Sequence, residues 1–201
     1  SFAGTVRAER LQFRPIFQMH STLPPGSLLY FIAPNSAYIS GIAFMRYGAS
    51  VTAESTETGH IVGLRDYSSG YVFYRDEQSN WHEQIVDKNQ TAQSLPTLPM
   101  KFGEAIILER AEMTADRIKR GEALVAILYW RTGASIDKDY SVFVHLVDKD
   151  GQIIAGADQL LLKGDAPTSR WRVNDPMTQG IIIPIDSAVA PGDYQIQIGV
   201  Y

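Results

Sequence analysis

Residues 194–201, Tyr-Gln-Ile-Gln-Ile-Gly-Val-Tyr, alternate between large apolar side chains and polar or small ones. In an extended chain, residues 194, 196, 198 and 200 share one face, and residues 195, 197 and 199 share the other. The turn signal Pro-Gly-Asp at 191–193 precedes them. One buried face and one solvated face are typical of antiparallel sheets, so the stretch predicts a half-buried strand.

The rest of the second half shows the same pattern of short strands separated by turns. Residues 148–151, Asp-Lys-Asp-Gly, are typical of a hairpin turn. About six strands in roughly 100 residues, with no helical spacing between them, predict an antiparallel β-sandwich that is immunoglobulin-like or jelly-roll-like. The other expected strands cover residues 105–110, 123–131, 140–147, 153–155 and 180–185.

The first half has the pattern of a small α/β unit of the βαβ type. The continuous apolar run at 28–33 predicts a strand covered on both faces. A helix is expected to start after residues 34–36 and to end at Gly48, and further strands are expected at 50–55 and 71–75. The predicted apolar stripe of this helix consists of Tyr38, Ile39, Ile42, Ala43 and Met45.

Two further segments of the first half are ambiguous, and a linker follows. Residues 59–67 fit a short helix or a strand, and residues 6–19 have helical spacing that Pro15 would interrupt. Residues 87–99 turn polar and end in prolines, which is typical of a linker. We therefore predict a small α/β domain at 1–95 and a β-sandwich domain at 100–201.

Composition limits the possible partners. The 201 residues include 18 Lys+Arg, 22 Asp+Glu and no cysteine, for a formal charge of −4. This balance argues against a nucleic-acid partner, and the lack of cysteine excludes disulfides and thiolate metal sites. The longest apolar runs, 28–33 and 123–130, are far shorter than the roughly 20 residues of a membrane helix. Because the sequence begins at Ser1 without a Met or a signal peptide, we expect that it is a piece of a longer protein.

Four stretches of the second half resemble one protein family: residues 122–131, 139–148, 166–171 and 191–201. They are similar to the soluble C-terminal region of bacterial polytopic membrane proteins related to the protein mannosyltransferase-like glycosyltransferases. The resemblance implies a domain on the extracytoplasmic face of a bacterial membrane, tethered by helices outside this sequence. It also implies that the membrane-embedded portion of the parent protein is a partner. In that family the catalytic carboxylates belong to the membrane portion, so the resemblance brings no active site to this chain.

No residue set in the chain identifies a reaction, and we predict no catalytic residue, metal or cofactor. The four histidines include no pair at the i, i+4 spacing of a helical metal site. His145 shares a strand face with Phe143 and Val147, which favours a half-buried, hydrogen-bonded structural histidine over a metal ligand. Residues 148–151 could suggest a calcium loop, but an exposed hairpin explains the same residues better.

Aromatic side chains are the better candidates for ligand binding, because sugar-binding sandwiches stack them against pyranose rings. The candidates are Trp81, Trp130, Trp171 and Tyr140. Trp130 ends a long apolar strand and is expected in the core. Trp171, which Arg170 and Arg172 flank, is the best candidate for a surface platform, although its place in the family pattern favours packing. The predicted ligand-binding residues are Trp171, Arg170, Arg172 and Tyr140.

Three functions stay open at this stage. The first is a non-catalytic accessory domain of a larger membrane protein, in line with the resemblance. The second is a carbohydrate-binding sandwich that recognises a glycan or a lipid-linked sugar. The third is a stand-alone enzyme that uses the carboxyl ends of the first-half strands, near residues 33–36 and 55–58.

Tyr194 is expected to act as a corner tyrosine whose hydroxyl binds backbone in a neighbouring loop.

Overall fold

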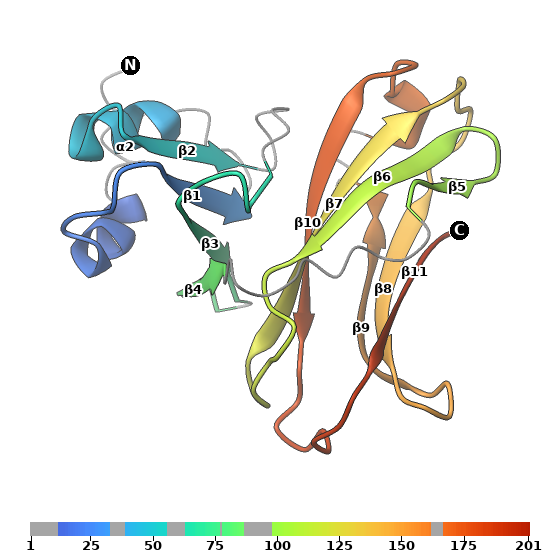
Figure 1. Ribbon diagram of the computed structural model, residues 1–201. Coiled ribbons are helices and arrows are strands. Elements are labelled where there is room, and N and C mark those ends of the chain that lie inside the picture. The colour runs from blue at the N-terminus through green and yellow to red at the C-terminus, as the bar shows by residue number, and fades with distance from the viewer. Residues whose placement is uncertain (1–11, 33–38, 56–62, 77, 87–97, 162–166) are drawn as a thin grey trace. The chain divides into compact units, whose positions relative to one another are not determined.

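The computed structural model describes residues 12–32, 39–55, 63–76, 78–86, 98–161 and 167–201 (Figure 1). The chain divides into two compact units, Ser1–Asn89 and Gln90–Tyr201. The predicted domain bounds, 1–95 and 100–201, stay predictions. Among the described residues, no helix is long and apolar enough to cross a membrane.

The first unit is built around the predicted βαβ element. Strand β1 (Ser27–Ile32) pairs in parallel with β2 (Val51–Ser55), and α2 (Ile39–Tyr47) lies between them in the chain. Strand β3 (Ser69–Arg75) adds in parallel on the other side of β1, and β4 (Trp81–Val86) pairs antiparallel with β3. The sheet order is β2-β1-β3-β4, so the fully apolar β1 is an inner strand that is buried along its whole length.

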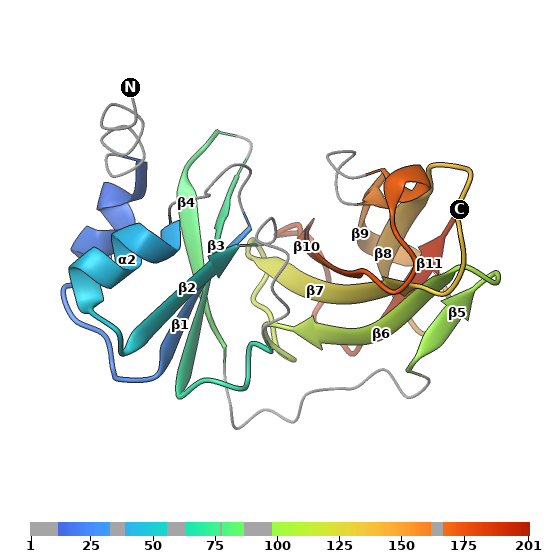
Figure 2. The same ribbon diagram turned by 90° about the horizontal axis from the view of Figure 1, so that it is seen from above.

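Two helices cover one face of this sheet, as Figure 2 shows. Residues 12–19 are helical, including Pro15, which was expected to interrupt the helix. One apolar cluster joins the helices to the sheet: Phe13, Ile16, Ile39, Ile42 and Ala43 from the helices, with Leu29, Phe31, Val51, Ala53 and Phe73 from the strands. The predicted core stripe of α2 is wrong at Met45, whose side chain is 63% exposed.

The second unit has two sheets. The four-stranded sheet has the order β10-β7-β6-β5, and the three-stranded sheet has the order β11-β8-β9. All pairings within both sheets are antiparallel. The strands are β5 (Met100–Phe102), β6 (Ile106–Met113), β7 (Ala123–Thr132), β8 (Ser141–Val147), β9 (Ile153–Leu160), β10 (Pro176–Pro184) and β11 (Gln195–Val200).

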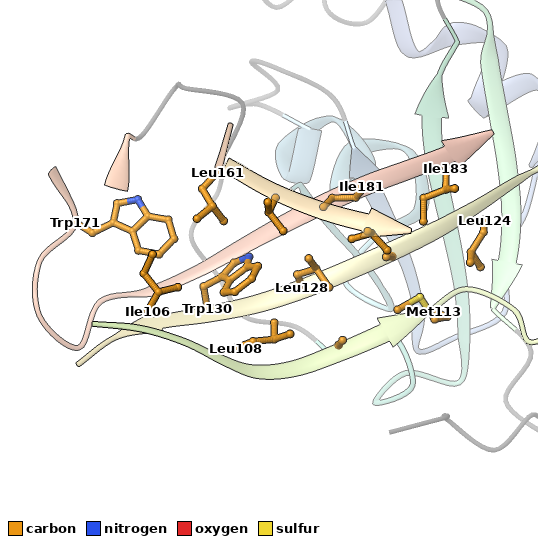
Figure 3. Packing of buried hydrophobic residues seen from close by; sticks show 14 of the residues in the cluster. Ile106, Leu108, Met113, Leu124, Leu128, Trp130, Leu161, Trp171, Ile181 and Ile183 are labelled. Carbon is orange, nitrogen blue, oxygen red and sulfur yellow. The ribbon is translucent and has the colours of Figure 1, made fainter. Parts of the chain in front are cut away.

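One apolar core lies between these two sheets and makes the unit a β-sandwich. Leu128, Trp130 and Ile181 of the larger sheet, which Figure 3 labels, belong to one buried cluster. Val142 and Val144 of β8 belong to the same cluster. The inward residues of β11, which are Ile196, Ile198 and Val200, pack against it as their alternation predicts. Trp130 is fully buried, which confirms its predicted place in the core.

The sequence pattern did not predict β4 or β5, and it did not decide whether residues 59–67 form a helix or a strand. Strands β4 and β5 were not expected, because β4 is mostly polar and β5 has only three residues. Residues 63–67 of the ambiguous 59–67 segment form turns and bends, and 59–62 lie outside the described residues. The expected hairpin at 148–151 is confirmed, since Asp148 N–H donates to Gln152 O over 3.0 Å and Gly151 has a φ of 78°.

Candidate functional site

Trp171, the predicted surface platform, lies inside the sandwich. Its side chain is only 5% exposed and belongs to the core cluster. Figure 3 shows its ring among the core side chains, near Ile106 and Leu161. The expectation of an exposed indole is therefore wrong, and the packing role that the family pattern favoured is the one observed.

Tyr140 lies close to the same segment because Thr168 links two loops. The buried Thr168 hydroxyl donates to Lys138 O (2.7 Å) and accepts from Tyr140 N–H (3.0 Å). Thr168 is the first residue of a short 3₁₀ helix (Thr168–Arg170), and its carbonyl accepts from Trp171 N–H. These bonds satisfy backbone groups of two loops, so the polar groups of this region stabilise the fold.

Arg170 and Arg172, the other two predicted residues, are exposed. The backbone carbonyl of Arg172 accepts a hydrogen bond of 2.5 Å from Thr132 Oγ1. Close by, hydrogen bonds from the side chain and backbone of Ser169 lower the pKa of Asp139. The predicted set thus combines two exposed guanidinium groups with two rings that pack on or in the core. Its binding of a ligand stays a prediction.

A different group of aromatic residues gathers on the outer face of the three-stranded sheet. We define the outer face as the side of β11-β8-β9 that points away from the core, with Phe143, His145, Asp158, Gln197 and Tyr201. Phe143 and His145 stack with ring centroids 4.5 Å apart and an interplanar angle of 23°. The Tyr201 ring lies 6.4 Å from Phe143 and is 63% exposed.

Two glycines allow these rings to lie flat on the sheet. Gly199 is the cross-strand partner of Phe143, and a Cβ at Gly199 would lie 2.2 Å from the Phe143 ring. Gly156 is the cross-strand partner of His145, and a Cβ there would lie 2.5 Å from the imidazole. Glycine inside a strand often marks close approach of another group, and here that group is an aromatic ring.

Polar groups surround the stacked rings. His145 Nε2 and Asp158 Oδ2 are 3.0 Å apart, with the His145 side chain 15% exposed and the Asp158 side chain 51% exposed. The prediction of a half-buried, hydrogen-bonded His145 is confirmed. Gln195 and Gln197 are exposed on β11. Apolar rings beside carboxylate and amide groups are chemically suited to a sugar, which has C–H faces and hydroxyl edges.

The sequence contained a signal for this site that alternation alone does not reveal. The sequence pattern places Phe143 and His145 on one strand face and Gly199 on the polar face of the last strand, whereas Gly156 lies just beyond the expected strand at 153–155. An aromatic residue opposite a strand glycine is a known stabilising pair, since the ring covers the backbone that glycine exposes. Recognising the pair requires the strand register, which the structure supplies.

Two other groups of polar side chains form hydrogen bonds within the fold. Asp148 Oδ1 accepts from the backbone N–H groups of Asp150 and Gln152, so this carboxylate caps the hairpin. In the first unit, His20 Nε2 lies 2.5 Å from Glu83 Oε1, and Trp81 Nε1–H donates to Gln12 O, which ties β4 to the helical residues 12–19. Within the described ranges, no three His, Asp or Glu side chains are grouped so that they could hold a metal ion.

A partly buried cluster of Arg110, Glu112 and Tyr129 lies on β6 and β7, with the Arg110 side chain 41% exposed. Tyr129 Oη donates to Glu112 Oε2 over 3.5 Å, and Arg110 Nε is 3.5 Å from Glu112 Oε1. The Arg110 guanidinium also lies 4.2 Å from the centre of the Tyr129 ring. Burial, with a smaller effect of the nearby Glu112 carboxylate, raises the pKa of Tyr129 and keeps its hydroxyl protonated.

Two further predictions have different outcomes. The Tyr194 hydroxyl donates to Ala190 O over 2.5 Å, which confirms a hydrogen bond to backbone, although the acceptor lies in the loop that leads into β11 and not in a neighbouring loop. The strand ends expected for a stand-alone enzyme, near 33–36 and 55–58, lie outside the described residues except for the buried Ser55.

Comparison with known proteins adds no relative: no protein-family model, no curated protein and no solved structure matches this chain.

Proposed function

We propose that the chain is a non-catalytic accessory module of a larger bacterial membrane protein related to the mannosyltransferase-like glycosyltransferases. In this proposal it lies on the extracytoplasmic face and contacts the membrane-embedded portion of its parent. The family-like stretches support it, since they coincide with β7, β8, η2 (Thr168–Arg170) and β11, whose inward residues belong to or pack against the sandwich core. The resemblance therefore concerns a fold, as an accessory module requires.

We also propose that the sandwich is immunoglobulin-like. Strands β6, β7 and β10 share one sheet, and β8, β9 and β11 share the other. This distribution corresponds to strands A, B and E facing C, C′ and F of an immunoglobulin domain. Tyr194 immediately precedes β11, and its hydroxyl binds the carbonyl four residues upstream, as a tyrosine corner does before strand F.

The accessory role has a direct test in the gene. The complete reading frame should encode several membrane helices upstream of the residue that is Ser1 here. A frame that starts close to Ser1 and encodes no membrane helix would contradict the proposal.

A second function, carbohydrate binding, is favoured by the outer face. The stacked Phe143 and His145 rings, the exposed Tyr201 ring and the hydrogen-bonding groups of Asp158 and Gln197 lie on one side of one sheet. Stacking on C–H groups with polar contacts at the edge is how such a surface would hold a pyranose. The parent resemblance suggests glycans or lipid-linked sugars as the ligand class.

Titration with oligosaccharides of mannose, glucose and N-acetylglucosamine tests this function. We expect backbone amide NMR shifts to concentrate in β8, β9 and β11, and Tyr201→Ala to weaken binding at least roughly fivefold, a typical loss for an aromatic contact of about 1 kcal/mol. Phe44→Ala is the matched control, because Phe44 is an equally exposed ring (59%) in the first unit. No shifts with any sugar, or equal losses in both variants, would exclude the outer face as the binding site.

A further inference from the structure

The surface of the first unit has an apolar helical layer that the proposed function does not use. Helix α2 buries Ile39, Ile42 and Ala43 against the sheet, yet Phe44 and Met45 on its opposite side are 59% and 63% exposed. A helix on the surface of a water-soluble domain normally carries polar residues on that side. The outer side of α2 therefore presents two large apolar side chains on the surface of the unit.

The helical residues 12–19 extend this surface. Tyr47 Oη donates to His20 O over 2.6 Å, and Arg46 Nη2 donates to Ser21 O over 2.9 Å. These bonds hold the carboxyl ends of the two helices side by side in one layer, visible in Figure 2. Met19, at the end of residues 12–19, is 53% exposed. We call Met19, Phe44 and Met45 the apolar surface of the layer.

The charge of this layer is opposite to that of the whole chain. Residues 12–53 contain no Asp or Glu, although the chain has 22 of them and a net charge of −4. The two arginines of this stretch, Arg14 and Arg46, are both exposed, one on each helix. The charged side chains within residues 12–53 are thus all positive, and Glu83 of β4, a carboxylate beside this layer, is paired with His20.

We infer that this helical layer docks on the surface of an anionic lipid bilayer. Phe44, Met45 and Met19 would enter the boundary between headgroups and acyl chains, and Arg14 and Arg46 would contact headgroup phosphates. Interfacial helices combine an apolar side with Lys or Arg, and the absence of Asp and Glu from residues 12–53 reduces the repulsion that an acidic chain would otherwise meet. The inference concerns the first unit and does not depend on the proposed function.

Vesicle sedimentation with the full 201-residue chain tests the inference. We expect binding to vesicles made of equal parts phosphatidylglycerol and phosphatidylcholine, and much weaker binding to phosphatidylcholine alone. Phe44→Gln/Met45→Gln should lower the partition coefficient about tenfold, since two apolar side chains no longer enter the interface. Arg14→Gln should lower it about fivefold, and added salt should weaken it further.

Ile153→Gln is the matched control, because Ile153 is equally exposed (60%) but lies on β9 in the second unit. It should bind like the unchanged chain. Circular dichroism should show that each variant stays folded. If the Phe44→Gln/Met45→Gln variant does not fold, Met19→Gln serves as an independent variant. Absence of binding to anionic vesicles, or binding that none of the helical-layer variants weakens, would overturn the inference. That result would direct attention to a protein partner for this surface.

Discussion

The burial of a tryptophan side chain is easier to predict from the sequence in a strand than in a loop, as the two buried tryptophans of the sandwich show. Trp130 lies in a strand of continuous apolar residues, and burial follows from that context. Trp171 follows a polar loop and has an arginine on each side, so its sequence context indicates a surface. It is nevertheless buried, because Trp171 follows directly on the 3₁₀ turn at Thr168–Arg170 and its ring packs into the core cluster of the sandwich.

Trp171→Ala tests this core role. We expect it to lower the free energy of unfolding by about 3–5 kcal/mol, the usual cost of deleting a large buried aromatic side chain. Urea denaturation measures the change, and the milder Trp171→Phe should show a smaller loss if the alanine variant does not fold. Val173→Ala is the control, since Val173 is 49% exposed and close in sequence. Equal effects of Trp171→Ala and Val173→Ala would contradict a core role.

Tyr194→Phe tests the corner hydrogen bond. Removing the hydroxyl leaves the ring in place but loses the bond to Ala190 O, so we expect a loss of stability of about 1 kcal/mol. Tyr201→Phe should be neutral, because the Tyr201 side chain is 63% exposed. A neutral Tyr194→Phe in equilibrium denaturation would show that this hydroxyl does not stabilise the corner.

The lowered pKa of Asp76 predicts that the stability of the β3–β4 hairpin depends on pH. A hydrogen bond from His82, with further bonds from Asn80, lowers the pKa of Asp76 to about 2. A carboxyl whose pKa is lower in the folded state stabilises the fold above its ordinary pKa, and that contribution is lost as the pH falls from about 4 to about 2. His82→Gln should raise the Asp76 pKa toward its ordinary value in carboxyl NMR titrations, while His145→Gln should leave it unchanged. An Asp76 that titrates near its ordinary pKa in the unchanged chain would contradict the prediction.

At the scale of elements, helix α2 shows a limit of hydrophobic spacing. Ile39, Ile42 and Ala43 were correctly assigned to the core, but Met45 was placed on the same stripe although it lies on the opposite side. Spacing identifies a face only when polar residues mark the other one. In α2 apolar residues occur on both sides, so the packing against the sheet decided which side is the core.

The outer face depends on the pairing of β8 with β9 and β11. We expect Gly199→Ala to lower the free energy of unfolding by about 1 kcal/mol, because the new Cβ displaces the Phe143 ring from the strand. In a Phe143→Ala background the same substitution should be neutral or stabilising, since alanine has less conformational freedom to lose than glycine. A double-mutant cycle measures this coupling. Equal effects in both backgrounds would mean that the position of the Phe143 ring does not depend on a glycine at residue 199.

At the scale of the whole molecule, the two compact units have different architectures. The first has one mixed sheet with helices on one face, and the second is an antiparallel sandwich. Local contacts between strands and the following helix define the first, whereas contacts between distant strands, such as β7 with β10, define the second. A single chain with such a change of pattern is expected to contain two domains.

The fragment 100–201 tests the predicted domain bounds. Its core cluster draws on β6, β7, β8 and β10 and on Trp171, all within these residues, so we expect the fragment to unfold cooperatively in urea. Trp171→Ala should destabilise the fragment and the full chain by similar amounts. A fragment without a cooperative transition would show that these bounds do not enclose an independent domain.

Much of the β-strand pattern followed from the sequence, because turn residues and alternation are local signals. The parallel pair of β1 and β2, the hairpin at 148–151 and the inward face of β11 were all predicted in this way. The polar edge strand β4 and the three-residue β5 lacked such signals, since their place depends on pairing with a neighbour. The outer face was not predicted for a related reason: the glycines beneath Phe143 and His145 and the Tyr201 ring beside them come from neighbouring strands, so their proximity depends on strand pairing.

The sequence by itself determined the coarse fold class of each half, the approximate positions of the strands other than β4 and β5, and the burial of Trp130, because hydrophobic periodicity and turn chemistry act over a few residues. Only the tertiary structure decided that Trp171 is buried, that Phe143 and His145 lie over Gly199 and Gly156, and that Phe44 and Met45 are exposed. These outcomes depend on strand register and on the packing of helices against a sheet, which bring together residues far apart in the chain.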